Sequence, residues 1–223
     1  MPVVITGDII GSSKLPQEQR QQRLNKLLEG LFAAIQTIWP QGGSAKAEII
    51  QGDSFQLYFP NDEEAIRAAL LIKCFCLSQE KVSRTYRINC RLSIAVGIVS
   101  FLHPDSLAKS GGPVFDYSGR GLKQISRTNP QLVFESTETT WAKAVNMGVA
   151  LADELIDRCT PSQSQALFWK LAYPQQNQEW LARQLGIGRS AYSQRLKQAG
   201  WAALDILLRY YSDTILNQLH DTN

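Results

Sequence analysis

Apolar residues along the first 135 positions of the chain follow two periods, one typical of strands and one typical of helices. Short β-branched or apolar runs predict strands at residues 3–10, 47–51, 55–59, 86–99 and 132–134. Apolar residues spaced by three and four predict helices at 16–39, after a cap at Asn61-Asp62, and at 117–127. The predicted order is strand, helix, hairpin, helix, strand, helix, strand.

This order predicts the fold class. A β-α-β-β-α-β core favours an α+β, ferredoxin-like arrangement, in which helices cover an antiparallel sheet. Residues 139–157 then predict a connecting helix. Beyond Thr160-Pro161 the β-branched runs stop and glutamines cluster, so we place a domain boundary near residue 158. The predicted domains are 1–158 and an all-helical 159–223.

The second domain contains the stretch "QEWLARQLGIGRSAYSQRLKQAGW", residues 178–201. Leu181 and Leu185 lie on one face of a helix, Gly186 permits a sharp turn, and Tyr192 and Leu196 bury a second helix. This spacing is typical of a helix-turn-helix that binds double-stranded DNA. The alternative is a helical hairpin that serves packing alone.

The second helix of this pattern has a polar outward side. Arginine and glutamine read base edges, whereas serine and lysine hold phosphates. The candidate DNA-binding residues are Arg189, Ser190, Ser193, Gln194 and Lys197.

A further apolar stripe at helical spacing follows the helix-turn-helix pattern. Two uses stay open, packing on the preceding helices or formation of a homodimer, which would suit a reader of paired half-sites. The stripe consists of Leu204, Leu207, Leu208, Tyr211, Ile215 and Leu219.

Composition and charge bear on the binding partners and the location expected for the protein. A net charge of +3 over 223 residues does not argue for nucleic acid by itself. We expect buried, reduced thiols for the four cysteines. The start lacks a basic region, and no apolar run approaches the ~20 residues of a membrane helix. The prediction is a cytoplasmic protein that does not enter a membrane.

Two Gly-Asp pairs, Gly7-Asp8 and Gly52-Asp53, carry the candidate chemistry of the first domain. The predicted topology allows the two carboxylates to face each other. Two neighbouring negative charges repel, so one carboxylate would be protonated unless a cation lies between them. Oxygen-only ligands suit Mg²⁺. Ser12 and Ser13, before the first helix, could then hold a phosphate. The alternative is that both pairs are structural turns.

The segments "VVITGDIIGSS", "QGDSFQLYFPNDEEAIRAAL", "RLSIAVGIV" and "GGPVFDYSGRGLKQISR" resemble the class III nucleotide cyclase fold over residues 2–127. The resemblance implies that Asp8 and Asp53 bind Mg²⁺ or Mn²⁺. It places Arg120 and Gln124 where a cyclase has its catalytic asparagine and arginine. Arg120 is therefore a candidate phosphate ligand, with a plain surface arginine as the alternative.

Two further departures concern base selection. The purine-selecting positions of a cyclase fall near Ile49 and at Pro113, neither of which can hydrogen-bond a base with its side chain. These departures argue against an active purine nucleotide cyclase.

One family resembles both halves of the chain. "ITGDIIGSSKL", "QGDSFQ", "GGPVF" and a helix-turn-helix ending in "AGW" resemble the bacterial SatD family. The interpretation is a DNA-binding transcriptional regulator with a degenerate cyclase-like sensor that binds a nucleotide or phosphate ligand through metal. The alternatives are a metal-dependent nucleotidyl cyclase or transferase with altered base selection, and an interaction protein without either activity.

Overall fold

The computed structural model describes residues 1–15, 17–38, 45–61, 63–79, 87–125, 130–136 and 139–221. Residues 16 and 39 of the first predicted helix, Asp62 of the predicted helix cap, residue 86 of the predicted strand 86–99 and the last residues of the helix predicted to 127 lie outside these ranges. Residues 87–88 and 97–99 are described but do not belong to the strand, so the predicted strand is too long at both ends.

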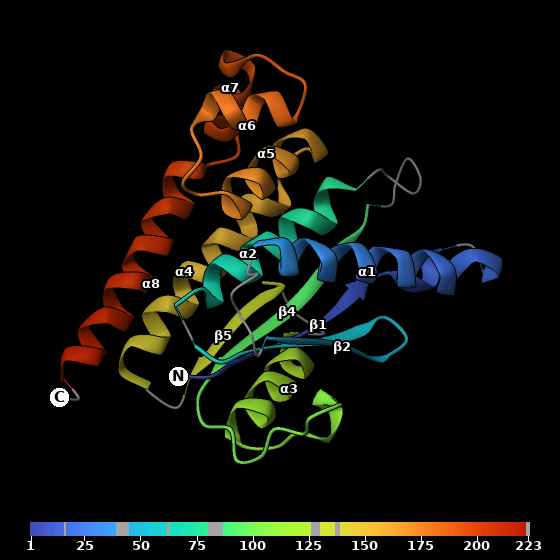
Figure 1. Ribbon diagram of the computed structural model, residues 1–223, viewed down its shortest axis with the longest axis vertical. Helices are drawn as coiled ribbons and strands as arrows, with labels where there is room; N and C mark the ends of the chain where they lie inside the picture. Colours follow the sequence, from blue (N-terminus) through green and yellow to red (C-terminus); the bar gives the residue numbers. More distant parts are fainter. Residues whose placement is uncertain are drawn as a thin grey trace.

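A five-stranded sheet forms the centre of the N-terminal part (Figure 1). Its strands are β1 (Val3–Ile10), β2 (Lys46–Gln51), β3 (Ser54–Phe59), β4 (Asn89–Val96) and β5 (Leu132–Ser136). The order across the sheet is β2-β3-β1-β4-β5, with β1 at the centre. The α+β class and the β-α-β-β-α-β core are therefore confirmed.

The sheet is antiparallel except at one edge. The pairs β2–β3, β3–β1 and β1–β4 are antiparallel, whereas β5 runs parallel to β4. The predicted all-antiparallel sheet is wrong for β5. Between β4 and β5 the chain crosses the sheet through a helix, and such a crossover brings the next strand back in the same direction.

Helices cover both faces of the sheet and build the C-terminal part. The described residues form α1 (Arg20–Ile38), α2 (Ala65–Ser78), α3 (Pro113–Ile125), α4 (Thr139–Asp157), α5 (Pro161–Ala172), α6 (Gln178–Gln184), α7 (Arg189–Gln198) and α8 (Trp201–Asp221). Figure 1 shows α1 and α2 on one face of the sheet and α3 on the other. No helix of the described ranges combines the length and hydropathy needed to cross a membrane.

Residues of β1 alternate between the two faces, as the period of two in a strand requires. Val3, Ile5 and Ile9 belong to the large core beneath α1 and α2, whereas Val4 belongs to a smaller core with residues of α3. Thr6 hydrogen-bonds Ser118 of α3, so the even-numbered side chains of β1 face α3. Asp8 shares this face.

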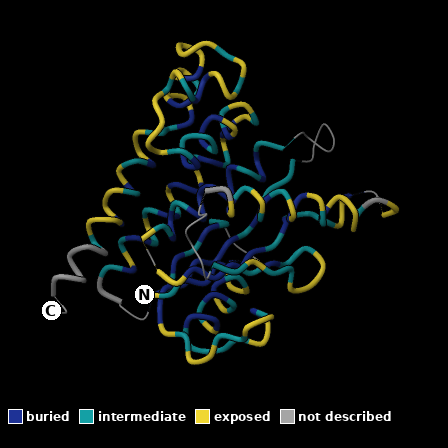
Figure 2. Tube along the Cα trace, viewed as in Figure 1, coloured by how far each residue is buried: buried dark blue, intermediate teal, exposed yellow. Residues whose placement is uncertain are grey.

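The large core continues from the sheet into the C-terminal helices (Figure 2). It runs without interruption from Val3 to Tyr211, and α5 packs along α2. The chain does turn at residues 158–160, where Thr160 and Gln163 form a capping box at the start of α5. The position predicted as a boundary is thus a turn between two helices that share one core.

Helix α8 lies antiparallel to α4, because Tyr211 contacts Trp141 and Leu207 lies against Gly148. Leu204, Leu207 and Tyr211 are buried, so packing is confirmed as the use of this part of the apolar stripe. The side chains of Ile215 and Leu219 are outside the described residues.

The cysteines are free and buried, as predicted. Burial raises the pKa of Cys74 and Cys90 well above the usual value, and that of Cys159 to about 11. Thiols in this state are poor nucleophiles.

Candidate functional sites

Asp8 lies in the central strand, not in a turn. Its backbone pairs with Ser54 of β3 on one side and with Arg91 of β4 on the other. Gly7 precedes it beneath the side chains of Phe55 and Leu92. The turn interpretation of Gly7-Asp8 is therefore wrong, and the carboxylate of Asp8 projects from the sheet on the face that α3 covers.

Asp53 lies in the hairpin turn between β2 and β3, where Gly52 has a φ of 60°. This second Gly-Asp pair is a turn, but Asp53 also reaches β1 and the loop after it. Its backbone oxygen accepts a hydrogen bond from the Ile9 amide at 3.3 Å, and its Oδ2 accepts one from the Ser12 hydroxyl. The structure thus brings Asp8, Asp53 and Ser12 to one end of β1.

Arg91 supplies a positive charge at the same place. Its Nε donates to Oδ1 of Asp8 at 2.7 Å and its Nη2 donates to Oδ2 at 2.5 Å. These hydrogen bonds raise the pKa of the guanidinium against the lowering effect of burial, and the charges of Asp8 and Asp53 raise it further. We call Asp8, Asp53, Arg91 and Ser12 the Asp8 cluster.

The Asp8 cluster has the oxygen donors that Mg²⁺ prefers, but both carboxylate oxygens of Asp8 already accept from the guanidinium of Arg91. The hydroxyl of Ser12 donates to Asp53 and is engaged as well. In this arrangement Asp8 does not fit a metal ion. Binding of Mg²⁺ or Mn²⁺ at Asp8 and Asp53 stays a prediction, and it would require Arg91 to move.

The other residues predicted to bind phosphate make their described contacts with residues outside this cluster. Ser13 is exposed, and its carbonyl accepts a hydrogen bond from Arg20 at 2.7 Å. Arg120 is an exposed residue of α3 whose guanidinium lies 4.7 Å from the centre of the Tyr117 ring. These contacts do not bring Ser12, Ser13 and Arg120 into one phosphate site.

Beside the Asp8 cluster, α3 closes tightly over the sheet. Thr6 hydrogen-bonds Ser118 at 2.8 Å and accepts from Gln56 at 3.2 Å. A Cβ atom at Gly121 would come within 2.2 Å of the Ser93 hydroxyl. The missing side chain at this position of α3 therefore permits the close approach. Thr6 and Ser93 of the sheet are packed against the helix.

Helices α6 and α7 form the second candidate site. Asn177 caps α6, and Gly186 ends it in the left-handed region with a φ of 64°. The Ile187 amide then donates to the Ala182 carbonyl and fixes the turn. Tyr192 is fully buried, and its hydroxyl donates to the carbonyl of Ala166 in α5 at 3.1 Å.

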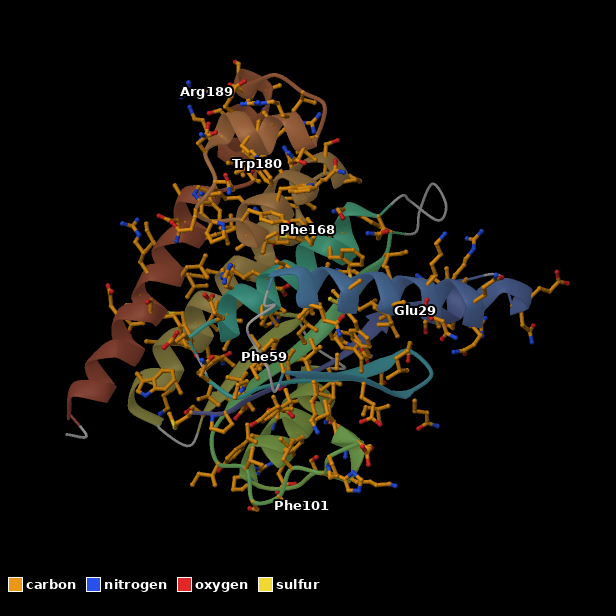
Figure 3. All side chains as sticks on the ribbon, viewed as in Figure 1. Glu29, Phe59, Phe101, Phe168, Trp180 and Arg189 are labelled. Atoms are coloured by element: carbon orange, nitrogen blue, oxygen red, sulfur yellow. The ribbon has the colours of Figure 1, made fainter. Side chains whose placement is uncertain are left out.

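The outward side of α7 is polar and open. Each residue predicted to touch DNA is exposed, namely Arg189, Ser190, Ser193, Gln194 and Lys197. Among the described contacts, Arg183, Arg189, Arg195 and Lys197 form no ion pair with a carboxylate. Figure 3 shows Arg189 at the end of the molecule farthest from the sheet, and Trp180 and Phe168 lie between Arg189 and the sheet.

Two charged residues with buried partners were not predicted from the sequence. Arg91 lies in the apolar segment "NCRLSIAV", and Lys73 lies in "LLIKCFC" of α2. A single cation inside an apolar strand or helix is the signal that could have indicated each of them, because such a charge must find a buried partner.

Two solved structures are similar to part of this chain at low identity. No family model matches the sequence, and no curated protein matches it, so membership of the SatD family stays a prediction. A solved structure of the active GGEEF domain of a diguanylate cyclase from Vibrio cholerae is 14% identical, with a TM-score of 0.44 over 62% of this chain and 84% of that one. A bacterial light-regulated adenylyl cyclase is 19% identical, with a TM-score of 0.43 over 60% of this chain and 74% of that one.

Proposed function

We propose that the protein is a DNA-binding regulator that contacts double-stranded DNA with the outward side of α7. The observation that supports the proposal is the exposure and the positive charge of the outward side of α7. Its predicted contact residues are all exposed, and its cations have no carboxylate partner among the described residues. The buried side of the same helix is anchored by Tyr192 and Leu196.

In this proposal α7 enters the major groove as the recognition helix, and α6 crosses the backbone. Arg189, at the first position of α7, and Gln194 reach base edges. Ser190, Ser193 and Lys197 contact phosphates and set the register of the helix on the duplex. Arg183 on α6 adds a further cation beside the backbone.

Replacement of Arg189 by alanine is expected to weaken binding to a preferred site about 10- to 100-fold, the loss of one base contact. Replacement of Lys197 by alanine should weaken binding similarly on all sequences, and it should lower the salt slope by about 1. Fluorescence anisotropy at several salt concentrations, with DNA selected by the wild type from a random pool, measures both quantities.

Arg23→Ala is the matched control, because Arg23 is an exposed arginine of α1, remote from α7. It should bind DNA as the wild type does. The proposal fails if the wild type shows no salt-dependent binding to any duplex, or if Arg23→Ala and Arg189→Ala lose affinity equally.

We propose that the α+β part carries the regulatory input. Support comes from the shared core, since α5, which anchors α7 through Tyr192, packs along α2 of the α+β part. A nucleotide or another phosphate compound is the predicted ligand, tested by thermal unfolding with a nucleotide panel with and without Mg²⁺. Release of pyrophosphate in that panel would instead favour the nucleotidyl cyclase or transferase.

We further propose that a second copy of the chain packs on an apolar face formed by α4 and α8. Four large apolar side chains stand out from this face, Met147, Leu151, Ile206 and Tyr210, which are 66%, 63%, 62% and 45% exposed. They line a groove of about 390 Å³. Within the described residues, these four are half of the exposed large apolar side chains. They lie together on two antiparallel helices.

A self-complementary apolar face suits a two-fold dimer. A standard interface buries about 800 Å² per partner, so residues around the four side chains would take part as well. Since α8 follows α7 directly, a dimer on this face would also fix the distance between two recognition helices, as paired half-sites require.

Leu151→Lys is expected to convert a dimer into the 24.9 kDa monomer, because a charge at the centre of an apolar interface has no partner. Light scattering after size-exclusion chromatography measures the mass. Ile98→Lys is the control, because Ile98 is also 63% exposed but lies on another surface. A wild-type mass equal to one chain at high concentration would contradict the dimer.

A further inference from the structure

The Asp8 cluster contains two carboxylates at one end of β1, and two like charges side by side repel each other unless a cation lies beside them. We propose that Arg91 is the resident cation of this cluster, and that it takes the place that a metal ion would occupy. The proposal is independent of DNA binding by α7.

The geometry of β1 and β4 makes the pairing specific. Asp8 and Arg91 are directly opposite each other in the antiparallel register, so their side chains leave the sheet on the same face. The guanidinium meets both carboxylate oxygens, at 2.7 and 2.5 Å. A bidentate fork of this kind is the strongest contact that a carboxylate makes with a side-chain cation.

The pair is shielded from solvent. The side chains of Arg91 and Asp8 are 24% and 16% exposed, so water and salt screen their attraction less than they screen a surface pair. Asp53 adds its charge to the same guanidinium and has its own donor in Ser12. Both carboxylates of the cluster are therefore satisfied by groups of the chain itself.

A metal ion would have to displace Arg91 to reach both oxygens of Asp8. The freed guanidinium would then lose its two hydrogen bonds to Asp8 and remain charged, because arginine does not give up its proton in proteins. With Arg91 in place, two carboxylates and one guanidinium leave one negative charge, which disfavours phosphate at this cluster, so a phosphate ligand of the α+β part would bind elsewhere on it. We therefore infer a closed cluster that joins β1, the β2–β3 turn and β4, with a metal site that appears only when Arg91 is removed.

The test compares thermal unfolding of the wild type and Arg91→Gln with and without Mn²⁺ or Mg²⁺. The wild-type midpoint should change by less than about 1 °C. Arg91→Gln should begin at a lower midpoint and rise by about 3–6 °C at a metal concentration about tenfold above its Kd. Asp8→Asn added to Arg91→Gln should abolish the rise.

Arg91→Lys is the matched control, since it keeps the charge and should stay insensitive to metal. Electron paramagnetic resonance of Mn²⁺ with the wild type gives a readout that needs no folded variant, and no stoichiometric binding is expected below about 1 mM. Binding of one Mn²⁺ by the wild type that Asp8→Asn removes would overturn the proposal. A folded Arg91→Gln that ignores both metals would overturn it too, because Arg91 would then exclude nothing.

Discussion

Replacement of Lys73 by alanine is expected to lower the free energy of unfolding by about 3–5 kcal/mol, the loss typical of a broken buried ion pair. The side chain of Lys73 is fully buried in α2. Its Nζ lies 2.7 Å from Oδ1 of Asp153 and 3.0 Å from Oδ1 of Asp157, both in α4. Without the ammonium group, Asp153 would remain buried with its charge unpaired.

The ion pair also joins elements that are far apart in the sequence. The Lys73 ammonium donates to the carbonyl of Cys90 in β4 at 3.4 Å, and Oδ2 of Asp153 accepts from the amide of Gln131 at 2.5 Å, directly before β5. Loss of the charge therefore affects α2, β4, α4 and the start of β5 together.

The charge of Lys73 should be present over the whole ordinary pH range. Burial by itself lowers the pKa of Lys73, but the nearby carboxylates, chiefly Asp153, outweigh it and raise the pKa above its usual 10.5. A raised lysine pKa contributes stability that is complete below the unfolded value and is lost as pH rises through the folded value. The stability difference between wild type and Lys73→Ala should thus be constant from neutral pH to about pH 10 and shrink above it.

Urea denaturation followed by circular dichroism measures this loss. Adding Asp153→Asn to Lys73→Ala should recover part of it, because the unpaired charge disappears while an oxygen remains for Gln131. Arg158→Ala breaks an exposed ion pair with Glu154 and should cost no more than about 0.5 kcal/mol. If Lys73→Ala costs no more than Arg158→Ala, Lys73 contributes no buried ion pair.

Replacement of Gly7 by alanine should cost about 3 kcal/mol or more through overpacking. An added Cβ would lie 2.5 Å from the Leu92 side chain, 2.6 Å from the Phe55 ring and 3.0 Å from the Arg91 carbonyl. Gly7 lies in the central strand, with β3 and β4 paired on either side, so the backbone has little room to move away.

Gly119→Ala in α3 is the control for Gly7→Ala. Nothing lies within 4 Å of its added Cβ, so it should gain up to about 1 kcal/mol from helix propensity. Chemical denaturation of the two variants should therefore give shifts of opposite sign. Equal small shifts would show that Leu92 and Phe55 yield to a methyl group at no cost.

Local periodicity explains why much of the fold could be predicted. The spacing of Leu24, Leu28 and Leu31 predicts a buried face of α1, and these side chains are indeed buried. The same period shows which residues of α7 face outward, so its exposed residues could also be predicted from the sequence. The direction of β5 was missed, although the helix predicted between the last two strands is the signal of a parallel crossover.

The Asp8 cluster was only half predictable. Approach of Asp8 and Asp53 follows from the position of the hairpin beside β1. Arg91 meets Asp8 only through the register of β1 with β4, and register across a long connection is set by the packed core. The same holds for Lys73 and Asp153, which are 80 positions apart in the sequence and meet where α2 packs near α4.

The packing of α5 on α2 bears on how such a protein can change during evolution. Ala166, Leu167 and Leu171 of α5 are fully buried, and Arg67 of α2 donates to the Leu171 carbonyl at 2.9 Å. A chain ending after α4 would leave the matching face of α2 in water. Recombination that exchanges the C-terminal helices, which is easier where a linker separates two units, would here require a new α5 that fits α2. The two halves of this chain are therefore expected to change together.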